Sequence, residues 1–241
     1  MKDVFAIKNI KGFIPTSLVD WDGKVSAVLF LSGCNFRCPF CLNKDLVLPN
    51  KELKAFSFEK IKEYLEKNKG FIDGIVITGG EPCLNDDLKE LCRELRKMDF
   101  KIKLDTNGSN PELLKQLIKE NLIDYIAMDI KSDKENYDKT SGVKVDLKKI
   151  EESMKIIINS GIDYEFRTTL VPTLHNQKVV ENIAKWLKEI SNSKIKKFVL
   201  QKFQVKDDLL DKEFEKLKSF KDEEMQEFKE IAERFVKTVL R

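Results

Sequence analysis

Three cysteines lie close together in the sequence, and their type and spacing are suited to metal chemistry. The segment GCNFRCPFC places Cys34, Cys38 and Cys41 with three and then two residues between them. A four-iron cluster has four corners, and cysteine thiolates usually fill all of them. Three thiolates would leave one iron without a protein ligand, just as catalytic zinc keeps one position open. The spacing therefore predicts a cluster that binds and orients a small molecule at its open iron.

A zinc site and a purely electron-transferring cluster are the alternatives for this motif. Neither is favoured, because Cys83, Cys92 and the single His175 are distant in the sequence and offer no nearby fourth ligand. Cys83 follows a glycine-rich turn and is a candidate neighbour of the active site. We expect Cys92 to lie in the core and His175 to be a surface or capping residue.

The composition fits a globular protein with one sizeable domain. The chain has 241 residues, of which 41% are hydrophobic and 35% charged, and its net charge is +3. No block of like charge indicates a nucleic-acid surface. The opening MKDVFAIKNI lacks the apolar core of a signal peptide, and no run of about 18 apolar residues predicts a membrane span. We therefore expect a cytoplasmic protein, in which clustered cysteines indicate metal or catalysis rather than disulfides.

Six short apolar runs read as strands that alternate with helices. Such an order predicts an α/β fold with a parallel sheet in a single domain, and right-handed crossovers curl that sheet into an open or closed barrel, such as a partial (β/α)6 barrel. We expect residues 1–204 to form this core with an amino-terminal extension, and residues 205–241 to form a helical segment packed on it. The predicted strands are Val25–Ser32, Gly74–Thr78, Lys101–Thr106, Asp124–Ile130, Tyr164–Val171 and Lys197–Phe203.

Amphipathic segments between and after these strands read as helices. We expect Ser57 and Asn85 to cap the first two helices. Ser219 and Asp222 would form a capping box for the last one. A polar loop covers residues 131–145. The predicted helices are Phe58–Lys69, Asp86–Met98, Asn110–Asn121, Leu147–Ser160, Gln177–Ile190 and Phe220–Val239.

The second predicted strand ends in a turn with two adjacent glycines, Gly79-Gly80-Glu81-Pro82. In α/β barrels the chemistry lies at the carboxyl ends of the strands, where the cysteine motif also falls. Glycines at a strand end let the backbone approach a ligand closely. An ordinary strand–helix turn is the alternative.

The third and fourth strands end in acidic motifs, Asp105-Thr106-Asn107-Gly108 and Asp129-Ile130-Lys131. The two aspartates end adjacent strands, so their carboxylates can converge. Such a pair is costly unless a cation or hydrogen bonds compensate it. Surface capping is the alternative for either aspartate alone.

One arginine lies in an apolar strand and needs an anion. Arg167, in the segment FRTTLVP, would pair best with a carboxylate, either of a ligand or of a structural salt bridge. Gln201 and Phe203 at the end of the sixth strand are further candidates to line a pocket.

Taken together, these motifs resemble the radical S-adenosylmethionine (SAM) superfamily. The resemblance implies a [4Fe-4S] cluster on Cys34, Cys38 and Cys41, with SAM bound to the open iron. In that family the aromatic residue at the position of Phe40 packs near adenine, and the GGE motif binds the amino group of SAM. The family's other SAM contacts would map onto Asn43, Gly79, Gly80, Glu81, Asp105, Asn107, Asp129, Lys131 and Arg167, with a monovalent cation near the two aspartates.

Within that superfamily the chain is similar to activating enzymes of glycyl-radical enzymes. The opening IKGFIPTSLVDWDGKVSAVLFLSGCNFRCPFCLN resembles activating proteins of the anaerobic ribonucleoside-triphosphate reductase, and the likeness continues to about Phe203. It implies a glycyl-radical enzyme as protein substrate. Electrons would come from an external ferredoxin or flavodoxin, because no ferredoxin-like insert is present. Leu42 departs from the histidine that commonly follows the third cysteine. A small-molecule enzyme such as a 7-carboxy-7-deazaguanine synthase and a non-catalytic cluster protein are the alternatives.

Overall fold

The structure is a computed structural model that describes residues 7, 9–48, 53–192, 195–205 and 207–241. Most of the opening MKDVFAIKNI, on which the prediction about a signal peptide rests, lies outside these residues. In the described part of the chain, no helix is both long and apolar enough to cross a membrane.

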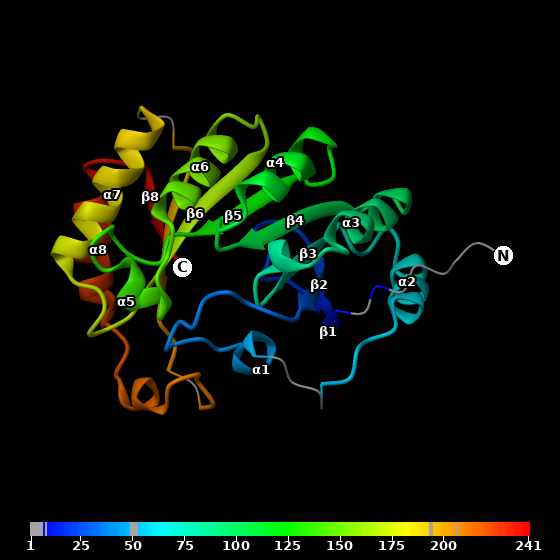
Figure 1. The fold of residues 1–241 in the computed structure, drawn as a ribbon, viewed down its shortest axis with the longest axis horizontal. Coiled ribbons are helices and arrows are strands. Elements are labelled where there is room, and N and C mark those ends of the chain that lie inside the picture. Colours follow the sequence, from blue (N-terminus) through cyan, green and yellow to red (C-terminus); the bar gives the residue numbers. More distant parts are fainter. Residues whose placement is uncertain (1–6, 8, 49–52, 193–194, 206) are drawn as a thin grey trace.

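One sheet holds eight strands in the order in which they follow one another along the chain. β1 runs antiparallel to β2, and every other neighbouring pair is parallel. In the described residues β1 does not pair with β8, so the curved sheet is an open barrel, which confirms the predicted α/β partial barrel (Figure 1). The strands are β1 Ile10–Ser17, β2 Ser26–Leu31, β3 Gly74–Gly79, β4 Lys101–Thr106, β5 Tyr125–Asp129, β6 Asp163–Leu170, β7 Phe198–Lys202 and β8 Thr238–Leu240.

Helices cover the convex face of this sheet (Figure 1). Their apolar residues recur at helical spacing, as in α2, where Phe58, Ile61 and Leu65 are buried. The predicted cap of this helix is confirmed, because the Ser57 side chain accepts a hydrogen bond from the Lys60 N–H. The helices are α1 Lys44–Val47, α2 Phe58–Lys67, α3 Leu88–Lys97, α4 Pro111–Lys119, α5 Tyr137–Ser141, α6 Leu147–Ile158, α7 Gln177–Ser191 and α8 Asp222–Glu233.

Alternation along the strands separates an apolar face from a polar one. On β4, Ile102 and Leu104 are fully buried in the main hydrophobic core, whereas the intervening Lys103 and Asp105 form an ion pair with each other. On β6, Phe166 belongs to the core and its neighbour Arg167 pairs with carboxylates. Charged side chains therefore gather on the concave face, below the carboxyl ends of the strands.

The carboxyl-terminal part differs from its prediction as one continuous helix. The helix α8 ends at Glu233, and the chain returns as β8, which pairs with β7. The predicted capping box was also wrong, because Glu224 accepts the Lys221 N–H while the Ser219 hydroxyl donates to the Phe203 carbonyl. A short edge strand such as β8 depends on its neighbour rather than on local pattern. The domain boundary at residue 204 stays a prediction.

Three smaller expectations are corrected as well. β1 lies in a segment for which we predicted no strand. The loop predicted over residues 131–145 contains α5. The helix α3 is preceded by Asp87 rather than capped by Asn85, whose side-chain amide donates to backbone carbonyls instead.

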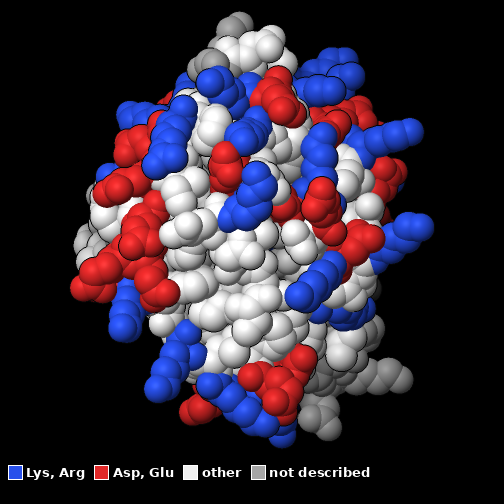
Figure 2. All heavy atoms as spheres, turned by 90° about the vertical axis from the view of Figure 1, so that its left-hand side faces the viewer, with Lys and Arg blue, Asp and Glu red and all other residues white. Residues whose placement is uncertain are grey.

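Figure 2 shows basic and acidic side chains interspersed over one face of the molecule.

Candidate active site

One cavity lies at the carboxyl ends of the strands and has a volume of about 480 Å³. It collects the side chains or backbone of every residue that the sequence motifs singled out as a site residue, from five parts of the chain. Their shared position is a finding of the structure, whereas their contacts with a cofactor stay predictions. These lining residues are Cys34, Cys38, Phe40, Cys41, Asn43, Gly79, Gly80, Glu81, Asp105, Asn107, Asp129, Lys131 and Arg167.

The cysteine loop leaves β2 and turns its carbonyl groups toward donors of the protein. The Arg37 guanidinium donates to the carbonyls of Cys34 and Phe36 at 2.6 and 2.7 Å. The Cys41 N–H donates to the Cys38 carbonyl at 3.0 Å. The loop is therefore folded by its own hydrogen bonds before any metal is considered.

Burial sets the protonation of the three thiols. It raises the pKa of Cys34 to about 11 and also raises the pKa of Cys38 and of Cys41. The ammonium of Lys131 acts on all three thiols in the opposite direction, by favouring the thiolate. The thiols would be deprotonated in full by a bound metal, whose charge outweighs the cost of burial.

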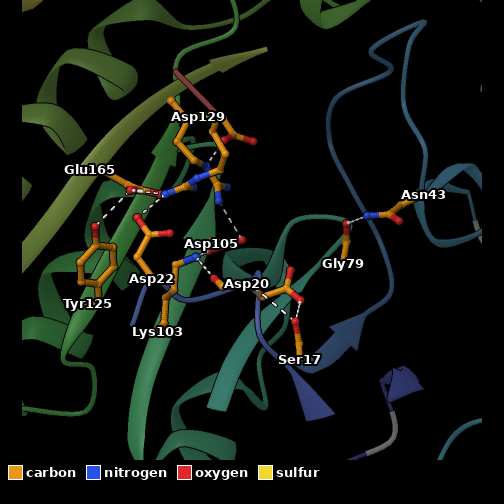
Figure 3. Close-up of polar contacts among 12 residues, drawn as sticks. Ser17, Asp20, Asp22, Asn43, Gly79, Lys103, Asp105, Tyr125, Asp129 and Glu165 are labelled. Carbon is orange, nitrogen blue, oxygen red and sulfur yellow. Dashed lines mark hydrogen bonds and ion pairs between the residues drawn. The ribbon is translucent and has the colours of Figure 1, made fainter. Parts of the chain in front are cut away.

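Two asparagines tie the cysteine loop to neighbouring strand ends. Asn35 donates to the Ser109 hydroxyl and accepts from the Asn107 amide, both at 2.9 Å. Asn43 donates through Nδ2 to the Gly79 carbonyl at 2.9 Å, as Figure 3 shows. These amides fix the loop against the ends of β3 and β4.

Two backbone segments hold the loop from its other side. The Arg37 N–H donates to the Ser141 carbonyl at 2.7 Å, next to α5. The segment that follows β7 crosses the loop, where the N–H groups of Leu210 and Asp211 donate to the carbonyls of Cys41 and Pro39. The three cysteines are thus placed by four neighbouring parts of the fold.

The double-glycine turn after β3 is tightly packed against the loop after β2. A Cβ on Gly79 would come within 2.3 Å of the Leu31 carbonyl oxygen, and one on Gly80 within 2.2 Å of the Gly33 oxygen. Gly79 also has a φ of +126°, which side-chain-bearing residues rarely adopt. Both positions therefore require glycine for the turn itself.

Glu81 is buried and fully engaged within the protein. Its carboxylate accepts hydrogen bonds from the Thr106 hydroxyl at 2.7 Å and from the N–H groups of Asn107 and Cys83 at 2.6 and 3.0 Å. Burial raises the pKa of this carboxyl, although the three donors oppose the rise. Glu81 therefore joins the ends of β3 and β4.

The two predicted aspartates do converge, and Arg167 lies between them. Its Nε donates to Asp129 at 2.8 Å and its Nη1 to Asp105 at 3.1 Å. Lys131 adds a second contact to Asp129, at 2.9 Å. Burial would raise the pKa of Asp129, but the two cations more than offset it and hold that pKa at about 2. The positive charge that the carboxylate pair needs thus comes from the chain itself.

A second ion-pair network lies deeper in the barrel. The buried Glu165 accepts hydrogen bonds from Tyr125 and Arg241, and Arg241 also pairs with Asp22 of the β1–β2 loop at 2.7 Å. Figure 3 shows Asp22, Glu165 and Tyr125 close together below Asp129. Asp22 therefore connects the β1–β2 loop with residue 241 across the open side of the barrel.

His175, which we expected to be a surface or capping residue, is buried and bonds to backbone groups. It is 4% exposed, its Nδ1 accepts from the Val171 N–H at 3.1 Å, and its Nε2 lies 2.9 Å from the Lys131 carbonyl. A backbone N–H can only donate, so the proton of the neutral ring is on Nε2 and points to that carbonyl. Burial lowers the pKa of His175. The side chain thus holds the backbone at the end of β5.

The remaining cysteines lie outside the cavity, whereas Leu42 lines it. Cys92 is buried in the core as predicted. Cys83 is 1% exposed and does not line the cavity, and its sulfur lies 3.7 Å from the Thr106 hydroxyl. Leu42 lines the cavity with half of its surface exposed. It has no group that could transfer a proton.

The cysteine loop fits an iron–sulfur cluster in the chemistry of its donors. Among the described residues, no three histidine, cysteine or carboxylate side chains are grouped as ligands of a single metal ion. The three thiols share one loop and one cavity, and a soft donor set of three cysteines is suited to a cluster with one open corner.

The sequence motifs missed one wall of the cavity. Gln201 and Phe203 were candidates and do line it. The other residues of this wall carry no motif, and only the alternation along β6 and β7 could have pointed to those on the strands. They are Val19, Thr169, Lys202, Gln204 and Arg241.

Comparisons with known proteins agree with this site. The profile of the Radical SAM superfamily matches residues 28–187. A Methanocaldococcus jannaschii protein named as a candidate glycyl-radical enzyme activating enzyme is 35% identical over 96% of this chain and 94% of its own length. A 7-carboxy-7-deazaguanine synthase of Synechocystis is 30% identical over 38% of this chain and 42% of its own length, so the chain spans less than half of that relative.

A solved structure shares the fold. A domain of the pyruvate-formate lyase-activating enzyme of Bacteroides vulgatus has a TM-score of 0.56, with 70% of this chain and 98% of that domain covered. The sequence identity is 16%, so the likeness concerns the fold alone.

Proposed function

The chain belongs to the radical SAM superfamily, and from this premise we propose that it activates a glycyl-radical enzyme. In the reaction, one electron and SAM yield methionine and a 5′-deoxyadenosyl radical. That radical takes a hydrogen atom from the α-carbon of a glycine in the partner enzyme. The products are 5′-deoxyadenosine and a glycyl radical. We expect this reaction in the cytoplasm, where thiols stay reduced.

The observation that carries the proposal is the cavity in which the three thiols face the ends of β3 to β7. In this proposal Cys34, Cys38 and Cys41 hold a [4Fe-4S] cluster, which when bound supplies the electron for cleavage of SAM. The double-glycine turn lines this cavity, and its backbone would contact the amino-acid end of SAM. Phe40, which packs edge-on against Phe203 with ring centroids 6.4 Å apart, would border the adenine.

Arg167 has the donors that a SAM carboxylate needs. Its Nε and Nη1 bind Asp129 and Asp105, and Nη2 bonds to none of the described residues, so its N–H groups could bind a ligand. A monovalent cation at the two aspartates has less to contribute, because Arg167 and Lys131 already compensate them. We therefore propose SAM and the cluster as the cofactors.

Activation of a protein substrate is favoured over a small-molecule reaction by the extent of the likeness. The match to the archaeal relative named for glycyl-radical enzyme activation extends over nearly the whole of both chains. The match to the deazaguanine synthase covers well under half of either. A ferredoxin or flavodoxin is the proposed electron donor. Beyond the three motif cysteines the chain has only two, which are too few to hold a second iron–sulfur cluster by themselves.

The proposal is tested by electron paramagnetic resonance. Anaerobically reconstituted protein, SAM, a reductant and each glycyl-radical enzyme of the same host would be mixed in turn. We expect a glycyl-radical doublet with one of them, lost when SAM is omitted. SAM cleavage without a doublet from any partner would contradict the proposal and favour the small-molecule reading.

A further inference from the structure

Two neighbouring polar side chains in the cavity have no hydrogen-bond partner among the described residues. Thr169 on β6 and Gln201 on β7 are paired in register on adjacent strands, and both line the cavity. Each is half-buried, and no hydrogen bond joins either side chain to another residue of the described chain. The next residue, Thr168, shows the contrast, because its hydroxyl donates to the Ile130 carbonyl at 2.8 Å.

The charged residues around this pair are already compensated. Lys202 pairs with Asp222 at 2.6 Å. Arg241 is bound by Glu165 and Asp22, as described above. Arg167 and Lys131 are likewise bound to aspartates. Apart from the more exposed amide of Gln204, what this wall offers to a ligand is therefore a neutral hydroxyl and a neutral amide, placed side by side on adjacent strands.

A hydroxyl and an amide at neighbouring positions match the hydrogen-bonding pattern of a peptide unit. The Gln201 amide offers one acceptor and two donors, and Thr169 offers a donor and an acceptor. A peptide unit presents one N–H and one C=O and carries no charge. Next to glycine these groups are especially accessible, because no side chain covers them.

We propose that Thr169 and Gln201 bind the backbone of the glycine-containing segment of the partner enzyme. This inference rests on the proposed function and names residues that bind the protein substrate. The pair lies on β6 and β7, three and four strands away from the double-glycine turn on β3. A segment held there would face the cofactor from the opposite wall of the cavity.

The adenosine part of SAM has the same chemistry, since its base and ribose also present donors and acceptors. The peptide and the nucleoside can be told apart by the affinity that falls when Thr169 or Gln201 is replaced. If the pair binds the peptide, its removal leaves SAM affinity intact and weakens the substrate. If it binds the nucleoside, SAM affinity falls first.

The test uses reconstituted full-length protein, SAM and a synthetic peptide of the partner's glycine segment with both glycine α-hydrogens replaced by deuterium. The variants are Thr169→Val and Gln201→Met, which keep the side-chain size, and Gln201→Glu as a second polar variant. Gln226→Met is the matched control, because Gln226 is exposed on α8 and its amide bonds only to Glu230. Thermal unfolding verifies that each variant folds.

We expect each cavity variant to bind the peptide about 3- to 10-fold more weakly, the effect of one neutral hydrogen bond. SAM affinity should stay within about twofold of the wild type by the same reasoning. Less deuterium should reach 5′-deoxyadenosine per SAM cleaved, and the control should match the wild type.

Three results would contradict this picture in different ways. Weaker SAM binding in the variants would assign the pair to the nucleoside. Unchanged peptide affinity and deuterium transfer would remove the pair from binding altogether. Wild-type protein that cleaves SAM but transfers no deuterium from any such peptide would overturn the proposed function itself.

Discussion

The two walls of the cavity use their polar side chains in opposite ways. On the wall of the cysteine loop and the ends of β3 and β4, the cavity-lining side chains of Asn43, Glu81 and Asn107 are all hydrogen-bonded within the protein. On the wall of β6 and β7, Thr169 and Gln201 have no such partners in the described chain. Groups that orient a cofactor need to be held in place beforehand, whereas groups that bind a substrate need to be free to do so. In the proposed function this contrast would separate a cofactor side from a substrate side.

The largest effect should come from removing a ligand on the cofactor side. Cys38→Ala should reduce bound iron from about four atoms per chain to nearly none and abolish SAM cleavage. Iron analysis and the yield of 5′-deoxyadenosine measure both. Cys83→Ala is the control and should keep its iron, because Cys83 does not line the cavity. Full SAM cleavage by the Cys38 variant would refute the ligand assignment.

The next effect should come from Arg167, which holds the two carboxylates together. Arg167→Leu leaves Asp105 and Asp129 without their shared cation, and breaking such a buried pair costs about 3–5 kcal/mol. Urea unfolding of the protein measures the loss, and SAM binding should weaken as well. The double variant with Asp129→Asn should recover part of the stability. If Arg167→Leu unfolds like the wild type, the ion pairs are not formed in solution.

His175 should give a smaller, pH-dependent effect. Its pKa in the folded protein is below the ordinary value of 6.5, so folding favours the neutral ring. The stabilisation is complete above pH 6.5 and is lost as the pH falls through the folded pKa. Because the chain has a single histidine, the decline in unfolding free energy between about pH 5 and pH 6.5 should largely vanish in His175→Gln, whereas below about pH 5 carboxyl groups such as Asp129 also lose stability.

Replacing His175 also tests whether the ring supports the end of β5. His175→Leu should lose about 1–3 kcal/mol, because it leaves the Lys131 carbonyl and the Val171 N–H unpaired. His175→Gln should lose less, since its amide can still donate to that carbonyl. Equal losses in both variants would mean that packing, and not the hydrogen bond, is what His175 contributes.

The residues of the proposed cofactor side could be picked out from the sequence, and found to share one cavity, because their signals are local. The cysteine spacing, the double-glycine turn and the acidic strand ends each lie within a few residues, and parallel strands bring such ends together. Arg167 was expected to bind an anion, but its choice of two aspartates emerges only from the register of β4, β5 and β6.

The wall of β6 and β7 was predicted only in part, because Gln201 and Phe203 were candidates to line a pocket and Thr169 was not. Thr169 and Gln201 stand out because nothing binds them, and that property depends on every neighbour in the folded chain. Arg241 reaches the cavity through β8, an edge strand of three residues without a local signal. His175 gave no hint of burial, because the Lys131 carbonyl that it holds is 44 residues away.

The most direct test of a cofactor side facing a glycine segment is the fate of the glycine hydrogen. Wild-type protein, SAM, a reductant and a partner enzyme labelled with α-dideuterated glycine would be combined, and 5′-deoxyadenosine analysed by mass spectrometry. The account predicts one deuterium in the nucleoside for each glycyl radical formed. 5′-Deoxyadenosine that carries only hydrogen, with the partner bound and SAM consumed, would contradict it.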